Sequence, residues 1–237
     1  MNGHHKSYPV HRGYAICTAP RSGSNFLCQI LASTGQLGRP LEYFNEGGRR
    51  HFDDPDYPSD RQAQIEKILT MGATPNGIYA LKIFAYQHDA IEGHIRWADA
   101  LPGLRFVVLQ RRDLLGQAIS WSRSLQTGQY RHGQASTGTA HYDAGQIAEC
   151  LKRVATEYAR WDVFFARNGA QPLRLYYEDL TANVASAVAD IAALVGVPPP
   201  AADPDFVTVR IQRDEESDAW RRRFIAERGD LNIVEKL

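Results

Sequence analysis

Short apolar runs alternate with amphipathic stretches along this chain of 237 residues. The apolar runs are bounded by turn residues, which predicts buried β-strands at residues 14–18, 77–84, 105–110 and 173–177. Between them, apolar residues recur at helical spacing and predict helices at 24–34, 61–71, 87–99, 113–127, 143–167, 181–195 and 215–228. Because strands that alternate with helices form a parallel sheet covered on both faces, we expect a three-layer α/β fold.

Two segments lack a regular period and are rich in residues that break helices and strands. We expect residues 36–60 and 128–141 to form irregular surface loops, from which functional sites are often built. The second loop is also a candidate lid or subunit-exchange segment. At average apolar content, residues 1–237 suit one domain rather than two.

The strand at 14–18 leads into the sequence Arg21-Ser22-Gly23-Ser24-Asn25, which opens the next helix. Such a unit points consecutive backbone N–H groups at one spot, at the positive end of a helix dipole. Gly23 allows close approach of an anion, Ser22 and Ser24 add hydroxyl donors, and Arg21 adds charge. The loop therefore predicts a phosphate or sulfate site, although a turn that merely caps a helix is an alternative.

A second basic segment follows the strand at 105–110. Arg111 and Arg112 end this strand, and Asp113 is a suitable N-cap for the helix in which Ser120 lies two turns on. An Arg and a Ser so placed can reach a second phosphate beside the first strand, whereas a solvated Arg pair is the alternative. The chain lacks the Walker A motif G-x-x-x-x-G-K-[ST], which argues against Mg²⁺-dependent use of ATP.

Several motifs in the same order resemble the sulfotransferase superfamily. They are A-P-R-S-G-S-N-F-L, then L-E-Y-F-N, then R-R-D-L-L-G-Q-A-I-S-W, with further likeness at 77–83, 177–180 and 212–220. The likeness is greatest to the bacterial carbohydrate branch, typified by trehalose sulfotransferase. It implies a P-loop-kinase-like α/β fold and sulfuryl transfer from 3′-phosphoadenosine 5′-phosphosulfate (PAPS), without a metal. The competing interpretations are a P-loop-kinase-like nucleotide phosphotransferase and a catalytically silent nucleotide-binding module.

The resemblance also implies roles for individual residues. Residues 21–25 would hold the 5′-phosphosulfate, Arg111 with Ser120 would hold the 3′-phosphate, and Arg213 would join the donor-binding residues. Asn25 stands where the family often has Thr. Arg112 replaces a common Pro, which leaves open which arginine reaches the nucleotide, although alignment through Asp113 favours Arg111.

Two residues are candidates for the chemistry itself. Glu42 falls where the carbohydrate branch carries its proposed catalytic base, although it could instead be a loop carboxylate paired with Arg39 or Arg49. Lys82 lies near the end of an otherwise apolar strand, where it could stabilise the leaving oxygen or simply extend its amine to solvent.

Composition limits the partners. With 27 basic and 27 acidic residues the net charge is zero, so we expect neither nucleic acid nor an acidic membrane as a partner. Three cysteines argue against a disulfide framework, and the absence of a leader-like or membrane-spanning run predicts a cytoplasmic protein without an integral membrane segment. We expect a small carbohydrate or glycolipid as the acceptor, with Trp121 and Tyr130 near it.

The helix at 143–167 carries an apolar stripe with an unusual share of aromatic residues. Its members are Ile147, Leu151, Val154, Tyr158, Trp161 and Phe165, with Phe164 beside them. This surface is larger than a small sheet easily covers, which predicts a homodimer whose partner shapes the acceptor pocket. The alternative is a helix buried wholly within its own domain.

Overall fold

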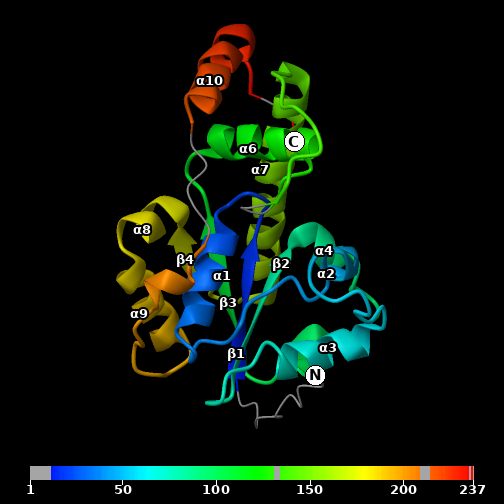
Figure 1. Ribbon diagram of the computed structural model, residues 1–237, viewed down its shortest axis with the longest axis vertical. Helices are drawn as coiled ribbons and strands as arrows, with labels where there is room; N and C mark the ends of the chain where they lie inside the picture. The colour runs from blue at the N-terminus through cyan, green and yellow to red at the C-terminus, as the bar shows by residue number, and fades with distance from the viewer. Residues whose placement is uncertain (1–11, 131–133, 209–213, 235, 237) are drawn as a thin grey trace.

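A parallel sheet in the order β2-β1-β3-β4 lies at the centre of the computed structural model, which describes residues 12–130, 134–208, 214–234 and 236 (Figure 1). Its strands are β1 (Arg12–Thr18), β2 (Ile78–Phe84), β3 (Leu104–Gln110) and β4 (Leu173–Tyr176). β1 pairs with two neighbours, so that Ile16 lies opposite both Lys82 and Val107. The predicted α/β fold with a parallel sheet is confirmed.

Alternate residues of β1 enter different cores, as the two-residue period of a strand requires. Tyr14 and Ile16 pack against α1 (Ser24–Ser33), α8 (Tyr177–Ala182) and α9 (Val184–Leu194). Ala15 and Cys17 pack on the opposite face, which is covered by α3 (Arg61–Thr70), α4 (Ala85–Asp89), α5 (Trp97–Ala100) and the C-terminal half of α7 (Ala144–Asn168). The sheet therefore has a helical layer on each face.

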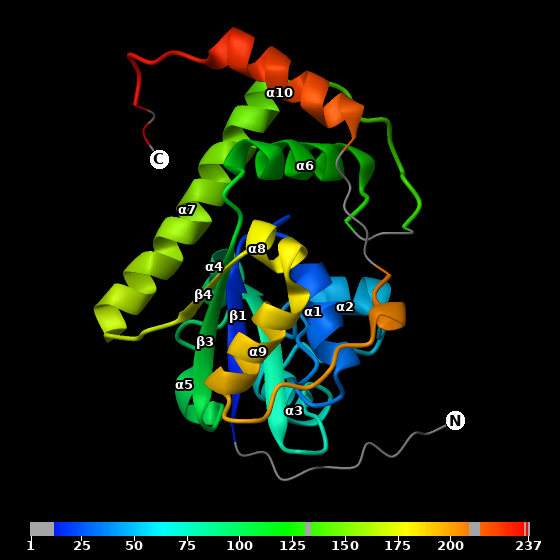
Figure 2. The ribbon, with the colours of Figure 1, turned by 90° about the vertical axis from the view of Figure 1, so that its left-hand side faces the viewer.

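A third apolar cluster lies beyond the carboxyl ends of the strands. It joins α6 (Leu114–Thr127), the N-terminal half of α7 and α10 (Glu215–Arg228), which Figure 2 shows at the end of the molecule toward which the strands run. α7 extends from this cluster down to the sheet and belongs to both. Helices α6 and α7 are thereby placed directly above the loop that follows β1.

Three predicted elements differ from the structure. The helix expected at 87–99 is divided into α4 and α5, because Gly93 between them adopts a left-handed φ of 77°. The loop expected at 36–60 contains α2 (Glu46–Phe52), which begins where the Asn45 side chain accepts from the Gly48 amide. The helix expected at 181–195 is α8 and α9, which are separated at Asn183 because its side chain caps α9.

The aromatic stripe of α7 is covered by the chain itself. Trp161 and Phe165 are each only 2% exposed, and they pack in the cluster on the sheet face together with Trp97 and Phe106. The observed packing agrees with the alternative interpretation, in which the helix is buried within its own domain. The stripe therefore does not require a partner subunit.

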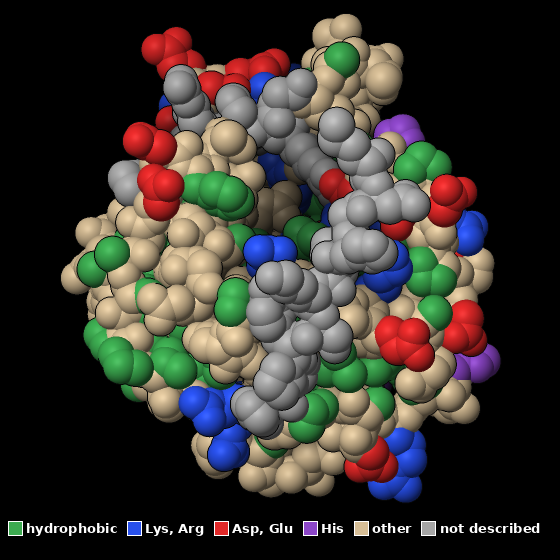
Figure 3. Space-filling model, turned by 60° about the horizontal axis from the view of Figure 1, so that its bottom comes forward, with side chains coloured by type: hydrophobic (Ala, Val, Ile, Leu, Met, Phe, Trp, Pro, Cys, Tyr) green, Lys and Arg blue, Asp and Glu red, His purple; other side chains and the backbone are tan. Residues whose placement is uncertain are grey.

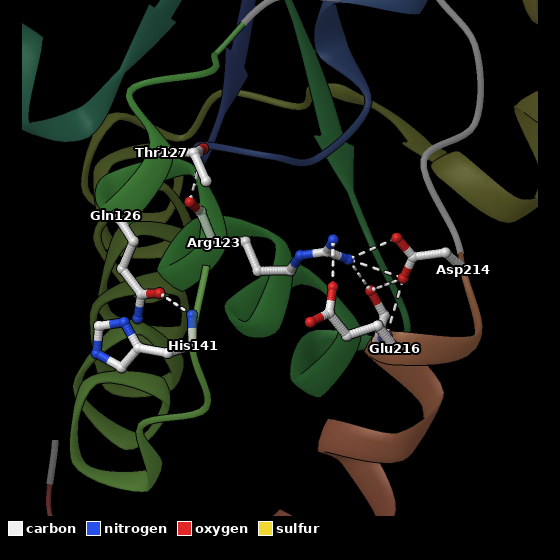
Figure 4. Close-up of polar contacts among 7 residues, drawn as sticks. Arg123, Gln126, Thr127, His141, Asp214 and Glu216 are labelled. Atoms are coloured by element: carbon white, nitrogen blue, oxygen red, sulfur yellow. Dashed lines mark hydrogen bonds and ion pairs between the residues drawn. The ribbon is translucent and has the colours of Figure 1, made fainter. Parts of the chain in front are cut away.

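Helix α10 is attached to α6 by an apolar contact and by ion pairs. Trp220 and Phe224 enter the third cluster. Beside them, Arg123 of α6 donates to Asp214 at 2.7 Å and to Glu216 at 2.8 Å, as Figure 4 shows. In the part of the chain that the structure describes, no helix combines the length and apolar character needed to cross a membrane.

The packing predicts that the apolar contact, rather than the ion pairs, holds α10 in place. Trp220→Ala removes a buried ring worth about 3–5 kcal/mol, so amide hydrogen exchange across α10 should become about 100-fold faster or more. Arg123→Gln removes partly exposed ion pairs worth about 1 kcal/mol or less, and exchange should rise only a few-fold. Arg222→Gln, on an exposed position of the same helix, is the control, and a larger effect of Arg123→Gln than of Trp220→Ala would contradict this ranking.

Candidate functional site

The loop between β1 and α1 makes a tight left-handed turn. Arg21 has a φ of 62° and Gly23 a φ of 86°, and Arg21 is the only non-glycine with positive φ among the described residues. Gly23 is required for a second reason, because a Cβ there would lie 2.1 Å from Cδ2 of Tyr177. The turn thus depends on a close approach between the loop and α8.

Buried polar groups of α6 and α7 hold this loop from one side. Gln117 donates to the Pro20 carbonyl at 2.7 Å, and the Tyr158 hydroxyl contacts the Gln117 amide oxygen at 3.0 Å. The Trp161 indole donates to the Thr18 carbonyl at 3.1 Å. A left-handed conformation costs a non-glycine residue about 1–2 kcal/mol, and these bonds to the carbonyls that lead into the turn help to offset that cost.

The start of α1 is suited to an anion. The helix begins after Gly23 with no side-chain cap among the described residues, which leaves its first amides available to a ligand. Ser24 opens the helix, as predicted. Ser22 differs from the expectation, because its side chain is fully buried and hydrogen bonded to the Thr18 hydroxyl at 2.7 Å. It therefore stabilises the loop internally rather than presenting a hydroxyl to a ligand.

Two arginines meet on the β3 side of the loop. Arg21 donates to the Ser120 hydroxyl at 3.0 Å and to the Tyr130 carbonyl at 2.9 Å, so two residues expected at different phosphates are in direct contact. Burial and the nearby charge of Arg111 both lower the pKa of Arg21. Because two cations brought together in a partly buried place repel each other, this side of the loop favours an anion between them.

The structure separates the roles of the two neighbouring arginines that end β3. Arg112 is half-exposed and makes two hydrogen bonds to the Asp179 carboxylate, at 2.7 and 2.6 Å. Arg111 is largely buried against the Tyr177 ring, 5.0 Å from its centroid, and its buried Nε has no hydrogen-bond partner within the described residues. Arg111 is therefore the arginine with an unsatisfied donor beside the loop.

Glu42 and Lys82 form a buried ion pair on the β2 side of the loop. Lys82 Nζ lies 2.8 Å from Glu42 Oε1 and also donates to Asn25 Oδ1 at 2.6 Å. The alternative pairing of Glu42 with Arg39 or Arg49 is not observed, since Glu42 pairs with Lys82 and Arg49 with Asp53. Nor does Lys82 extend to solvent, because its side chain is only 5% exposed. Asn25 thereby connects the loop after β1, through Lys82, to the carboxylate.

The second carboxylate oxygen of Glu42 accepts two further hydrogen bonds. Oε2 accepts from the Asn45 amide at 2.9 Å and from the Gln87 amide at 2.8 Å. Burial by itself would raise the pKa of Glu42, but the charge of Lys82 and the hydrogen bonds from Lys82, Gln87 and Asn45 outweigh it and lower the pKa to about 2. The group is a fixed carboxylate at neutral pH.

The site therefore has a basic half and a carboxylate half on either side of β1. Arg21, Ser120 and Arg111 lie toward β3, and Glu42 with Lys82 lies at β2. Both halves are at the carboxyl ends of the strands, where ligands bind in parallel α/β sheets. The space-filling view shows a hollow in the face that it draws, with Lys and Arg side chains visible inside it (Figure 3).

Sequence reasoning missed several residues that shape the site. Gln117 and Gln87 gave no signal because amides at helical positions are common on surfaces, while Tyr177 lay in a segment noted only for its likeness to the superfamily. Of the aromatic residues expected near an acceptor, Trp121 is buried beneath Arg153, whose guanidinium lies 4.5 Å from its ring, and Tyr130 is exposed. Arg213 lies outside the described residues.

One group of potential metal ligands lies elsewhere. His88, Asp89 and Glu92 can bring ligand atoms within 4.8 Å of one another at the end of α4. Asp89 is already ion-paired with Arg160, and His88 packs among the aromatic rings of Trp97, Trp161 and Phe164. We attach no metal function to this group.

Two relatives resemble this chain along most of its length. A trehalose 2-sulfotransferase of Mycobacterium tuberculosis is 28% identical to this chain, over 94% of the chain and 97% of the relative. A trehalose 2-sulfotransferase of Mycolicibacterium smegmatis is 26% identical, over 89% of the chain and 93% of the relative. Both relatives therefore align along nearly their whole length.

Among solved structures, a sulfotransferase from Alicyclobacillus acidocaldarius shares the fold with a TM-score of 0.50. Its sequence identity is 15%, and the match covers 92% of this chain and 94% of that one. The model of the Stf0 sulphotransferase family matches residues 13–227. Because this match includes the sheet, the loop after β1 and both halves of the site, the chain belongs to the Stf0 sulphotransferase family.

Proposed function

We propose that this sulfotransferase moves a sulfuryl group from PAPS to a hydroxyl of a carbohydrate or glycolipid-type acceptor, with Glu42 as the general base. The observation that carries the proposal is the continuous connection from the anion-binding loop to a buried carboxylate, through Asn25 and Lys82. The relatives named trehalose 2-sulfotransferase support a sugar as the acceptor.

The basic half of the site fits a donor that carries two separate phosphate groups. The uncapped start of α1 can receive the 5′-phosphosulfate, where backbone amides supply several donors at once. Arg111, with its unsatisfied Nε, and Ser120 can receive the 3′-phosphate. Arg21 lies between them and would exchange its hydrogen bonds to Ser120 and Tyr130 for contacts with the donor.

The reaction needs one bond to form, one to break and one proton to move. The acceptor oxygen bonds to sulfur, the bond from sulfur to the bridging phosphate oxygen breaks, and the hydroxyl proton passes to Glu42. A carboxylate with a low pKa remains ionised and accepts the proton late, once the oxygen bonded to sulfur has become acidic. Lys82 holds the carboxylate in place and can donate to the developing charge on the leaving oxygen.

Two alternative functions, a nucleotide phosphotransferase and a catalytically silent nucleotide-binding module, can be distinguished from a sulfotransferase by experiment. A nucleotide phosphotransferase would require a Lys after the loop glycine, where this chain has Ser24 and Asn25. A catalytically silent module would bind nucleotide without needing the buried Glu42–Lys82 pair. Thermal stabilisation by 3′,5′-adenosine bisphosphate but not by ATP with Mg²⁺ would exclude the first, and transfer of labelled sulfuryl from PAPS to trehalose would exclude the second.

We also propose that the protein is cytoplasmic and forms a homodimer. Since the stripe of α7 is already covered, the candidate interface shifts to exposed apolar side chains near the C-terminus: Ile225, Ile233 and Val234. Light scattering that gives a monomer mass at micromolar concentration, together with full activity, would contradict the dimer.

Glu42→Gln should separate catalysis from donor binding. The amide keeps the shape of the side chain but cannot accept the proton, so turnover should fall about 100-fold or more. Because Glu42 lies in the carboxylate half of the site, affinity for 3′,5′-adenosine bisphosphate measured by calorimetry should change little. Near-normal turnover in this variant would place the base elsewhere.

The two arginines that end β3 should differ in their effect on donor binding. Arg111→Ala removes a charge-assisted contact worth about 1.5–3 kcal/mol, so affinity for 3′,5′-adenosine bisphosphate should fall about 10- to 150-fold. Arg112→Ala removes the contacts with Asp179 and the Tyr176 ring and should change affinity less than about threefold. The reverse order in calorimetry would show that Arg112 reaches the nucleotide.

Lys82→Met should raise the pKa of Glu42. The variant keeps the burial that raises this pKa and removes the cation that lowers it, so the value should move from about 2 toward or above the ordinary value of 4.5. Titration of ¹³C-labelled Glu carboxyl groups by NMR measures the change, and Glu42→Gln identifies the signal. Since a lowered pKa stabilises the fold above pH 4.5 and loses this effect as the pH falls toward 2, Lys82→Met should also reduce the pH dependence of stability in that range.

A further inference from the structure

Two aromatic rings stand at the point where β2 ends and α4 begins. The Phe84 and Tyr86 rings are stacked, with centroids 5.6 Å apart and planes inclined by 29°. Phe84 is buried, whereas Tyr86 is 47% exposed. A buried ring that supports an exposed one forms a rigid apolar surface facing solvent, because the inner ring fixes the position of the outer one.

This aromatic pair lies on the side of the site away from the arginines. β2 and β3 flank β1 on opposite sides, and Arg111 follows β3. Phe84 is the last residue of β2, two positions beyond Lys82, whose amine lies 5.5 Å from the Phe84 ring. A donor held by Arg111, Ser120 and the loop extends toward β3, so the acceptor must approach from the β2 side, where the pair is.

Gln87 connects the pair to the proposed base. This buried residue donates to Glu42 Oε2 at 2.8 Å and accepts from the Phe84 backbone amide at 3.1 Å. Burial and the charges of Glu42 and Glu157 raise the pKa of the Tyr86 hydroxyl, which lies in the field of the base while much of its ring remains open to solvent. Because Lys82 and Gln87 each contact both Glu42 and Phe84, the aromatic pair and the carboxylate are direct neighbours.

The surroundings of the ring combine an apolar face with a polar edge. Glu42, Asn45 and Gln87 adjoin the pair on one side, and the charges of Glu157 and Arg153 act on the Tyr86 hydroxyl from α7. A pyranose has the matching chemistry, since its axial C–H groups form an apolar face and its hydroxyls project around the edge. An acyclic polyol offers the hydroxyls without the apolar face.

We propose that Tyr86, backed by Phe84, is the residue on which a pyranose ring of the acceptor stacks, so that one of its hydroxyls is directed toward Glu42. This inference rests on the proposed function and adds the residue that selects for a sugar ring. It replaces Trp121, which Arg153 covers, as the expected aromatic contact.

The test compares Tyr86→Ala with Tyr86→Phe in the full-length chain, with trehalose and methyl α-glucoside as acceptors and PAPS as donor. Loss of the ring should raise KM for both sugars about tenfold or more, whereas Tyr86→Phe, which keeps the ring, should stay within about threefold of the unchanged protein. Affinity for 3′,5′-adenosine bisphosphate and the thermal unfolding midpoint should be unaltered in both variants. Phe206→Ala, at an exposed aromatic residue outside the site, is the matched control and should leave KM unchanged.

The outcomes distinguish this inference from the function on which it rests. If the unchanged protein sulfates the sugars and Tyr86→Ala has the same KM, the stacking role is wrong and the proposed function stands. Mannitol, an acyclic polyol, serves as a further acceptor. If Tyr86→Ala raises KM for mannitol as much as it raises KM for the sugars, the stacking role is also wrong. Binding of the bisphosphate nucleotide without transfer to any pyranoside would overturn both the sugar acceptor and the stacking role.

Discussion

The chain leaves β1 through a left-handed turn at Arg21 and Gly23, and both halves of the site depend on how this turn is held. A non-glycine residue in this conformation is unfavourable, so it persists only where its surroundings determine it. Here Gln117 and Trp161, which lie 97 and 143 positions away in sequence, donate to the Pro20 and Thr18 carbonyls that lead into the turn. The third apolar cluster joins α6, α7 and α10 and so fixes the helices that hold the loop.

The same turn divides the charges of the site. Arg21 is directed toward Ser120 and Arg111, where neighbouring cations favour an anion. Four residues later, Asn25 faces the other way and accepts from Lys82, which also holds Glu42. In water such an ion pair would contribute little, whereas burial and complete hydrogen bonding make it a fixed carboxylate beside a fixed ammonium group. The arginines and the carboxylate thereby lie on opposite sides of one strand.

Most of the fold was predictable because strands and long helices repeat their apolar residues at distinct periods. β1, β2, β3, α6, α7 and α10 lie within a few residues of their predicted bounds. The errors fall where a single residue overrides the period: Gly93 divides a predicted helix, and Asn45 and Asn183 begin helices through their side chains. The apolar stripe of α7 was recognised, but periodicity could not show that one chain has enough surface to cover it.

The sequence by itself determined the fold class, the position of the loop between β1 and α1, and the motifs shared with the family, because these are local patterns that a short stretch of chain specifies. The tertiary structure alone decided which groups are partners. In the folded chain the Ser22 side chain is buried, Arg21 donates to Ser120, and Arg112 is hydrogen bonded to Asp179. Glu42 pairs with Lys82 rather than with Arg39 or Arg49. Each of these contacts except that of Ser22 joins residues distant in sequence, and their distances follow from the order of strands in the sheet. Ionic and hydrogen-bonding partners therefore depend on how the elements pack, and a local sequence pattern does not predict that packing.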